Sequence, residues 1–221
     1  MALLTACNAR AEPKEEPSSG AAKDSGNATT VPVVLFVGTS LTAGYGLSPE
    51  DGWTADIQAR IDARGWQLRV VNAGVSGETS AGALRRIDWV LGQGAPALVM
   101  IETGANDGLR GLDIGALEAN LDSILGTVEQ VRPRPAILVA GMEALPNMGS
   151  MYVNRFRQVF PRAAQRYHAA YLPFFLDGVA GVARFNQADG IHPNPEGADR
   201  VAANVWAVLE PVLDSIVRAQ P

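Results

Sequence analysis

A serine stands where the chain could place a nucleophile. Ser40 follows the apolar run Val33–Val37 and lies in a turn rich in glycine and hydroxyl residues, "GTSLTAGYG". A serine becomes a nucleophile when a base lies within hydrogen-bond reach and a third group orients that base. The first question is therefore which residue of this chain can act as the base.

The chain has two histidines, His168 and His192. His168 lies within the helical stretch "AQRYHAAY", where a surface or helix-end role is the simpler interpretation. His192 follows Asp189 by three residues in "DGIHPNPEG", and that spacing can fold the carboxylate back onto the imidazole. Taken alone, this turn favours Asp189 as a backbone cap. Its position beyond the last predicted strand, on the same edge as Ser40, favours His192 as the base.

Hydrolysis of an ester or thioester also needs donors where the carbonyl oxygen becomes an oxyanion. Three candidates follow successive strands: the N–H of Ser40, the N–H of Gly74 and the side-chain amide of Asn106. Gly74 and Asn106 each have a structural alternative, since glycine fits many turns and asparagine can cap a helix. Their occurrence at successive strand ends favours an oxyanion hole.

Short apolar runs alternate with amphipathic, helix-length segments from Val31 onward. Such runs predict strands of a parallel sheet that helices cover on both faces. The predicted strands are Val33–Val37, Leu68–Asn72, Ala97–Glu102, Ala136–Gly141 and Ala169–Phe174, and the predicted helices lie within residues 51–65, 80–94, 113–131, 151–168 and 195–217. The fold class is α/β with a doubly wound sheet, in which ligands bind outside the carboxyl ends of the strands.

Four segments, in order, resemble the four sequence blocks of the SGNH (GDSL-like) hydrolase superfamily: "FVGTSLTAGYGL", "VNAGVSGETS", "GAND" and "DGIHP". Within it, the likeness is to the bacterial arylesterase, acyl-CoA thioesterase and lysophospholipase group. The resemblance implies Ser40 as nucleophile, His192 as base and Asp189 as its orienting acid. It also implies an oxyanion hole made by the Ser40 N–H, Gly74 and Asn106. The implied fold is a flavodoxin-like, three-layer α/β/α sandwich of about five parallel strands, with no cofactor and no metal.

One position departs from the superfamily pattern. Thr39 stands where the motif Gly-Asp-Ser-Leu has aspartate, so this residue keeps a hydrogen-bonding hydroxyl and loses a charge. We expect Ser40 to remain active, with the support of the oxyanion loop altered. A catalytically idle, envelope-anchored scaffold is the non-enzymatic alternative, and Thr39 is the feature in its favour.

An apolar loop, "GMEALPNMGSMY", follows the fourth predicted strand. Methionine fills irregular apolar space and accommodates varied ligands. We expect Met142, Leu145 and Met148 to line a groove for an acyl chain or aryl group, with Leu109 on the opposite wall. Packing beneath a long loop is the simpler alternative for these residues.

The resulting functional prediction is a serine esterase. It would hydrolyse carboxylic esters or thioesters through an acyl-enzyme, with small aryl or acyl esters, acyl thioesters or lysophospholipids as substrates. A carbohydrate O-acetyl esterase is the alternative enzyme, and it would need a more polar cleft than this apolar loop provides.

Composition argues against several other classes. The formal charge is −5 and the isoelectric point is near 5.1, so there is no basic excess to bind a nucleic-acid backbone. The single cysteine, Cys7, allows no disulfide within the chain and no cysteine–histidine metal site. No apolar run is long enough to predict a membrane-spanning helix. Nothing in the sequence indicates an obligate protein partner.

The first thirty residues differ from the rest. "LTAC", ending at Cys7, resembles a lipobox, although only six uncharged residues precede the cysteine, fewer than a secretory signal has. We therefore interpret residues 1–7 as a truncated signal and lipobox, or as a chance match. Residues 8–30 lack large apolar side chains, which predicts a disordered tether before the hydrolase domain at 31–221. A periplasmic or envelope-associated location, with membrane anchoring through lipidated Cys7, is the corresponding expectation.

Overall fold

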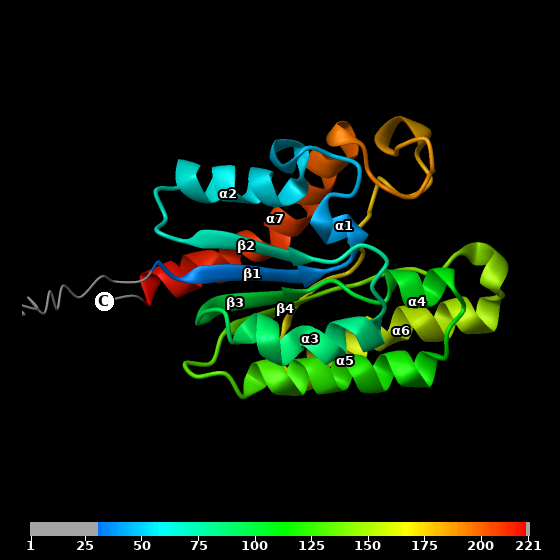
Figure 1. The fold of residues 1–221 in the computed structure, drawn as a ribbon, viewed down its shortest axis with the longest axis horizontal. Helices are drawn as coiled ribbons and strands as arrows, with labels where there is room; N and C mark the ends of the chain where they lie inside the picture. Colours follow the sequence, from blue (N-terminus) through cyan, green and yellow to red (C-terminus); the bar gives the residue numbers. More distant parts are fainter. Residues whose placement is uncertain (1–30, 220–221) are drawn as a thin grey trace, which may run out of the picture. The chain divides into compact units, whose positions relative to one another are not determined.

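A five-stranded parallel sheet organises the chain (Figure 1). The computed structural model describes residues 31–219, so the predictions for Cys7 and for the tether at 8–30 lie outside the described residues. The strand order is β2-β1-β3-β4-β5. The strands are β1 (Val33–Gly38), β2 (Arg69–Gly74), β3 (Pro96–Ile101), β4 (Ala136–Ala140) and β5 (Ala170–Leu172). The predicted α/β class with a doubly wound sheet is confirmed.

Helices cover both faces of this sheet (Figure 1). On one face lie α2 (Trp53–Ala63) and α7 (Pro195–Arg218), and on the other lie α3 (Ser80–Leu91), α5 (Ile114–Glu129) and α6 (Ser150–Arg166). Shorter elements connect them: α1 (Ser40–Ala43), α4 (Ala105–Leu109) and the 3₁₀ turns η1 (Pro49–Asp51), η2 (Pro146–Met148) and η3 (Ala183–Phe185). None of the helices in residues 31–219 is both long and apolar enough to cross a membrane.

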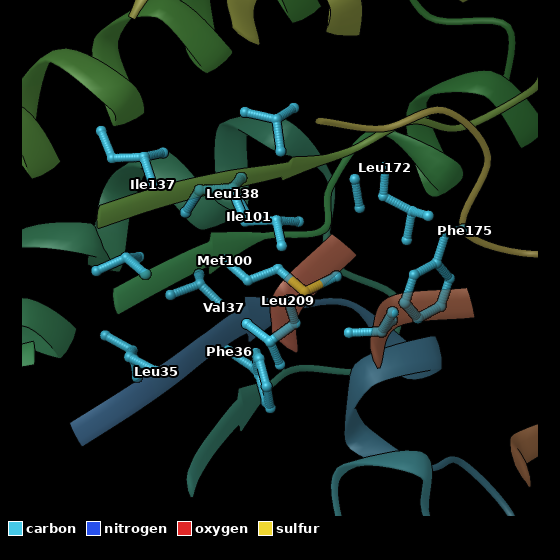
Figure 2. Packing of buried hydrophobic residues seen from close by; sticks show 14 of the residues in the cluster. Leu35, Phe36, Val37, Met100, Ile101, Ile137, Leu138, Leu172, Phe175 and Leu209 are labelled. Atoms are coloured by element: carbon cyan, nitrogen blue, oxygen red, sulfur yellow. The ribbon is translucent and has the colours of Figure 1, made fainter. Parts of the chain in front are cut away.

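Apolar side chains from the central strands form two buried layers. Every residue of β1 is buried, as expected for a strand with neighbours on both sides and helices on both faces. Phe36 pairs in register with Met100 of β3, and Phe36 also contacts Trp53 of α2 with ring centroids 4.8 Å apart. Figure 2 shows Phe36 and Met100 in the layer that includes Leu209 of α7.

Two strands differ from the predictions for a physical reason. β2 is an edge strand whose residues are exposed or half-buried, with Arg69 and Asn72 exposed, so it is not covered like the central strands. β5 is only three residues long and stops before Pro173, which has no N–H to continue a ladder. Both departures lie at edges of the sheet. The carboxyl ends of β1 and β3, which precede Ser40 and Asn106, agree with expectation within one residue, whereas β2 continues two residues beyond the predicted end and includes Gly74.

Candidate active site

The turn after β1 places Ser40 at the carboxyl end of the sheet. Ser40 is the first residue of α1, so its N–H has no acceptor within the helix, and 9% of the residue is exposed. Only glycine fits at residue 38, because a β-carbon there would lie 2.1 Å from Oγ1 of Thr42 and 2.6 Å from Oε2 of Glu102. The backbone can therefore turn sharply and present Ser40 at the surface of the sheet edge.

The structure brings Ser40, His192 and Asp189 into one hydrogen-bonded chain. Nε2 of His192 lies 2.9 Å from Oγ of Ser40, and Nδ1 lies 2.7 Å from Oδ2 of Asp189. Oδ1 of Asp189 accepts the N–H groups of Ile191 at 2.9 Å and of His192 at 3.0 Å. The bond from the imidazole, followed by those from the two N–H groups, lowers the pKa of Asp189 to about 2. The carboxylate thus favours the tautomer with its proton on Nδ1, which leaves Nε2 to accept the Ser40 proton.

His168 takes no part in the hydrogen bonds that connect Ser40, His192 and Asp189. It follows α6 with a φ of +52° and has the helix-end position that its sequence context favours.

Glu102 supports the serine turn from below. It is buried, and its carboxyl accepts the Thr39 N–H at 2.8 Å, the Thr39 hydroxyl at 3.0 Å and the Thr42 hydroxyl at 2.8 Å. Burial raises its pKa to about 7, and the hydrogen bonds act in the opposite direction. Sequence reasoning missed this residue, although an acidic residue ending the apolar run "ALVMIE" is a usable signal. The loop that bears Ser40 is therefore held in place although Thr39 replaces aspartate, because the hydroxyl groups of Thr39 and Thr42 donate to Glu102.

Asn106 lies in the first turn of α4, at the carboxyl end of β3, and lines the same groove as Ser40. One of its side-chain N–H groups donates to the carbonyl oxygen of Glu78 at 2.9 Å. A carboxamide has two such donors, so the second is available toward Ser40. The helix-cap alternative does not hold, because the N-cap position of α4 belongs to Gly104.

The second oxyanion residue requires a correction, because Gly74 is not placed as predicted. Its N–H donates to Oδ1 of Asn72 at 2.9 Å, and it packs so closely on α1 that a β-carbon would lie 2.3 Å from the Ala43 nitrogen. Gly77, three residues later, lines the groove beside Asn106 and has a φ of +77°. Within residues 31–219 its N–H has no hydrogen-bond acceptor. Gly77 is therefore the glycine whose N–H is available at this site.

A groove of about 650 Å³ opens beside Ser40 and His192. Met142, Leu145 and Leu109 line it, as predicted. Met148 does not; it lies in η2 and contacts Gly111, where a β-carbon would be 2.6 Å from its terminal methyl. A further wall that sequence reasoning missed comes from the segment between β5 and α7, with Phe174, Leu176, Ala180 and Ile191.

Charge is sparse around this groove. Among the described residues that line it, Glu143 is the one charged side chain apart from His192, and it pairs with Arg157 at 3.1 Å. No cluster of three or more metal-binding side chains occurs in the part of the chain that the structure describes. The geometry therefore suits a substrate with an uncharged, apolar acyl or aryl part, attacked by an activated serine.

Comparison with known proteins gives a consistent result. The sequence profile of the GDSL-like lipase/acylhydrolase family matches residues 36–200. Esterase TesA of Pseudomonas aeruginosa is 43% identical over 181 residues, covering 81% of this chain and 89% of that protein. Thioesterase 1/protease 1/lysophospholipase L1 of Escherichia coli K12 is 33% identical over 189 residues, covering 85% and 88%.

Comparison with a solved structure supports the same family. The crystal structure of TesA superposes with a TM-score of 0.77 at 42% identity, covering 81% of this chain and 99% of that one. The resemblance to SGNH hydrolases is thus confirmed in sequence and in fold. The chain belongs to the GDSL-like lipase/acylhydrolase family.

Proposed function

We propose that this chain is a serine hydrolase that cleaves carboxylic esters and thioesters through an acyl-enzyme. The observation that carries the proposal is the chain of hydrogen bonds from Ser40 through His192 to Asp189 at the mouth of an apolar groove. Membership of a family whose named relatives include an esterase and a thioesterase/lysophospholipase supports the same reaction. The intact constellation argues against an idle scaffold.

The geometry supports a two-step reaction. Oγ of Ser40 attacks the substrate carbonyl while Nε2 of His192 takes the hydroxyl proton, and Asp189 stabilises the imidazolium. The tetrahedral oxyanion accepts hydrogen bonds from the N–H of Ser40, the N–H of Gly77 and the amide of Asn106. When the intermediate collapses, His192 gives its proton to the departing alcohol or thiol, and the acyl group stays on Ser40. Water then attacks the acyl-enzyme as His192 takes a proton from it, and His192 returns that proton to Oγ of Ser40 when the carboxylic acid leaves.

The groove supports an acyl or aryl group as the part of the substrate that is recognised. Met142 is buried at its floor, whereas Leu109 and Leu145 are exposed at its rim, where a chain could displace water from them. A sugar would leave its hydroxyl groups beside these apolar walls without partners, which costs free energy. We therefore favour small aryl or acyl esters, acyl thioesters and lysophospholipids over acetylated carbohydrates.

We also propose a location in the cell envelope. The lipobox-like "LTAC" and the polar stretch at 8–30 support a periplasmic enzyme tethered to a membrane through lipidated Cys7. Mass spectrometry of the protein from its native membrane tests this, because lipidation would add diacylglyceryl mass to a peptide that begins at Cys7. An unmodified Cys7 in the membrane-derived protein would exclude the anchor.

The experiment that tests the reaction is hydrolysis of p-nitrophenyl esters from acetate to palmitate by the protein and by Ser40→Ala. We expect turnover that is lost in Ser40→Ala and highest at medium or longer chains. A peak confined to acetate would instead indicate a deacetylase. Equal rates from both proteins, or none from either, would leave the fold without its chemistry and favour the scaffold.

A further inference from the structure

We propose that Gln187 and Tyr45 are positioning residues for His192. The carboxamide of Gln187 ties the turn that bears Tyr45 to the loop that bears His192, and the Tyr45 ring then holds the imidazole toward Ser40. The inference rests on the proposed esterase function, because it assigns roles within the same site. Both residues act through His192 and not on the bond that breaks.

Gln187 connects two segments that lie 142 residues apart in the sequence. Its Nε2 donates to the carbonyl oxygen of Tyr45 at 2.7 Å and to that of Pro193 at 2.9 Å. Its backbone N–H donates to the carbonyl oxygen of His192 at 2.7 Å. Both side-chain donors are thus used on main-chain carbonyls, one in the turn after Ser40 and one directly after His192.

The turn that accepts this bond is shaped for close approach. Gly44 and Gly46 flank Tyr45 with φ values of +71° and +77°, a region that glycine adopts without strain. A β-carbon at Gly46 would lie 2.3 Å from Oε1 of Gln187, so the carboxamide packs directly on the backbone. The N–H of Tyr45 donates in turn to the carbonyl oxygen of Ser40 at 3.0 Å. Gln187 is therefore coupled to the nucleophile through one short turn.

The ring of Tyr45 covers a face of the base. Its centroid lies 4.6 Å from that of the His192 imidazole, with the two planes tilted by 40°. Tyr45 is 53% exposed, so the apolar core does not account for its position, whereas the His192 side chain is only 17% exposed. Hydrogen bonds hold the imidazole only at Nδ1, to Asp189, and at Nε2, to Ser40, which leaves the ring some freedom to tilt about the line that joins the two nitrogens. A ring against its face removes this freedom.

Holding the imidazole matters because the transferred proton moves over a short distance. Nε2 of His192 must face Oγ of Ser40 in the first step and the leaving group in the second, and a misplacement of about 1 Å can cost about a hundredfold in rate. The imidazolium that forms during each step is also favoured beside an aromatic face. The arrangement of Tyr45 and Gln187 should therefore raise kcat. Gln187 does not line the groove, so its replacement should leave substrate binding nearly unchanged, whereas Tyr45 also lines the groove.

The first test is Gln187→Glu, which keeps the size of the side chain and removes both N–H donors at neutral pH. With p-nitrophenyl acetate we expect kcat to fall roughly tenfold to a hundredfold, with KM little changed. Gln93→Glu is the matched control, because Nε2 of Gln93 donates to the Trp89 carbonyl at 3.1 Å on an exposed part of α3. The control should keep the wild-type kcat.

The second test separates the ring from its hydroxyl. Tyr45→Ala should lower kcat, and Tyr45→Phe should restore it, because the ring covers the imidazole in both the wild type and the phenylalanine variant. If Gln187 acts through Tyr45, the double variant Gln187→Glu/Tyr45→Ala should be no slower than the slower single variant. Additive losses, or a wild-type kcat in Gln187→Glu, would overturn the proposal.

A measurement without turnover completes the test. The proton on Nδ1 of His192, hydrogen-bonded to Asp189, should give a low-field NMR signal in the wild type, Tyr45→Phe and Gln93→Glu. We expect solvent exchange to broaden or remove it in Gln187→Glu and Tyr45→Ala. An unchanged signal in both variants would contradict the positioning role. A wild type that hydrolyses no ester would defeat the proposed function instead, and this signal would still decide the role of Gln187 and Tyr45.

Discussion

Asn106 uses its two side-chain N–H groups for different purposes. One holds the carbonyl oxygen of Glu78 at 2.9 Å and fixes the amide plane, which leaves the other for the oxyanion beside Ser40. In Asn106→Ala we expect kcat to fall roughly a hundredfold to a thousandfold, with KM little changed, because the lost bond forms to charge that develops in the transition state. Steady-state kinetics with a p-nitrophenyl ester measures both. A loss of kcat below about tenfold would remove Asn106 from the oxyanion hole.

Thr39 contributes a hydroxyl to a buried acid. Thr39→Val keeps the shape of the side chain and removes the donor that lies 3.0 Å from the Glu102 carboxyl. We expect the free energy of unfolding in urea at pH 7 to fall by about 1–3 kcal/mol, and Thr39→Ser to remain near the wild type. Thr39→Asp should bring no gain in kcat, because a second carboxyl would then face Glu102. Equal stability of the valine variant and the wild type would show that this hydroxyl contributes nothing to the turn.

Residue types and spacing were enough to predict the roles of Ser40, Asp189 and His192, because a nucleophile, a base and an acid are recognisable by their chemistry. They failed to distinguish Gly74 from Gly77, since a sequence does not show which N–H of a turn is already hydrogen-bonded. Glu102 and Gln187 were missed for another reason. The contacts that matter here join Glu102 to Thr39 and Thr42, 60 or more residues earlier, and Gln187 to Tyr45, 142 residues earlier, so no local pattern reveals them.

At the scale of elements, α3 connects the loops that build the site. Arg86 of α3 donates to both carboxylate oxygens of Glu78, at 2.8 and 2.6 Å, and to the carbonyl oxygen of Gly38 at 3.2 Å. Glu78 in turn accepts the Asn106 amide through its main-chain carbonyl. One helix thereby links the end of β1, the loop after β2 and the start of α4. The oxyanion donors at those three positions depend on that link for their spacing.

Arg86→Met tests this link, because methionine keeps an apolar stem and leaves Glu78, whose side chain is 9% exposed, without its cation. We expect stability to fall by roughly 1–3 kcal/mol and kcat to fall by at least about tenfold as the donors shift. Arg60→Met is the control, since its pair with Asp56 is about one-third exposed and should contribute about 1 kcal/mol or less. Urea unfolding and ester kinetics measure both variants. Equal effects from the two would mean that Arg86 forms an ordinary surface pair.

Helices whose apolar residues recur with a clear helical period were predictable, and short elements were not. In the part of the chain that the structure describes, the five helices longer than ten residues lie where their apolar spacing placed them, within three residues at each end. α4 was missed because five residues that include Gly108 give no periodic signal. β2 was expected to be covered on both faces, but the sequence does not show which strand lies at an edge.

At the scale of the whole molecule, the site is built at the carboxyl ends of the parallel strands. The alternation of strands and helices predicted this placement, because parallel strands bring their carboxyl ends together. The groove was only half predictable. Its wall between residues 174 and 191 contains no strand or α-helix, only turns and η3, and the side chain of Asn204 in α7 holds it through the carbonyl oxygens of Phe175 and Asp177. Glu102, the buried acid beneath the carboxyl ends of the strands, then connects the site to the stability of the whole fold.

Glu102 makes that connection measurable through pH. Burial raises its pKa from 4.5 to about 7, so the folded protein binds a proton that the unfolded chain has released between those values. Stability from this group is therefore present below pH 4.5 and lost as the pH rises through 7, a change on the order of 3 kcal/mol. Glu102→Gln removes the titration. The difference in unfolding free energy, wild type minus variant, should fall between pH 4.5 and 7 and stay constant above about 8. Urea unfolding at pH 5, 6, 7 and 8 measures it, and a difference that is the same at all four values would mean that Glu102 has the same pKa in the folded and unfolded states.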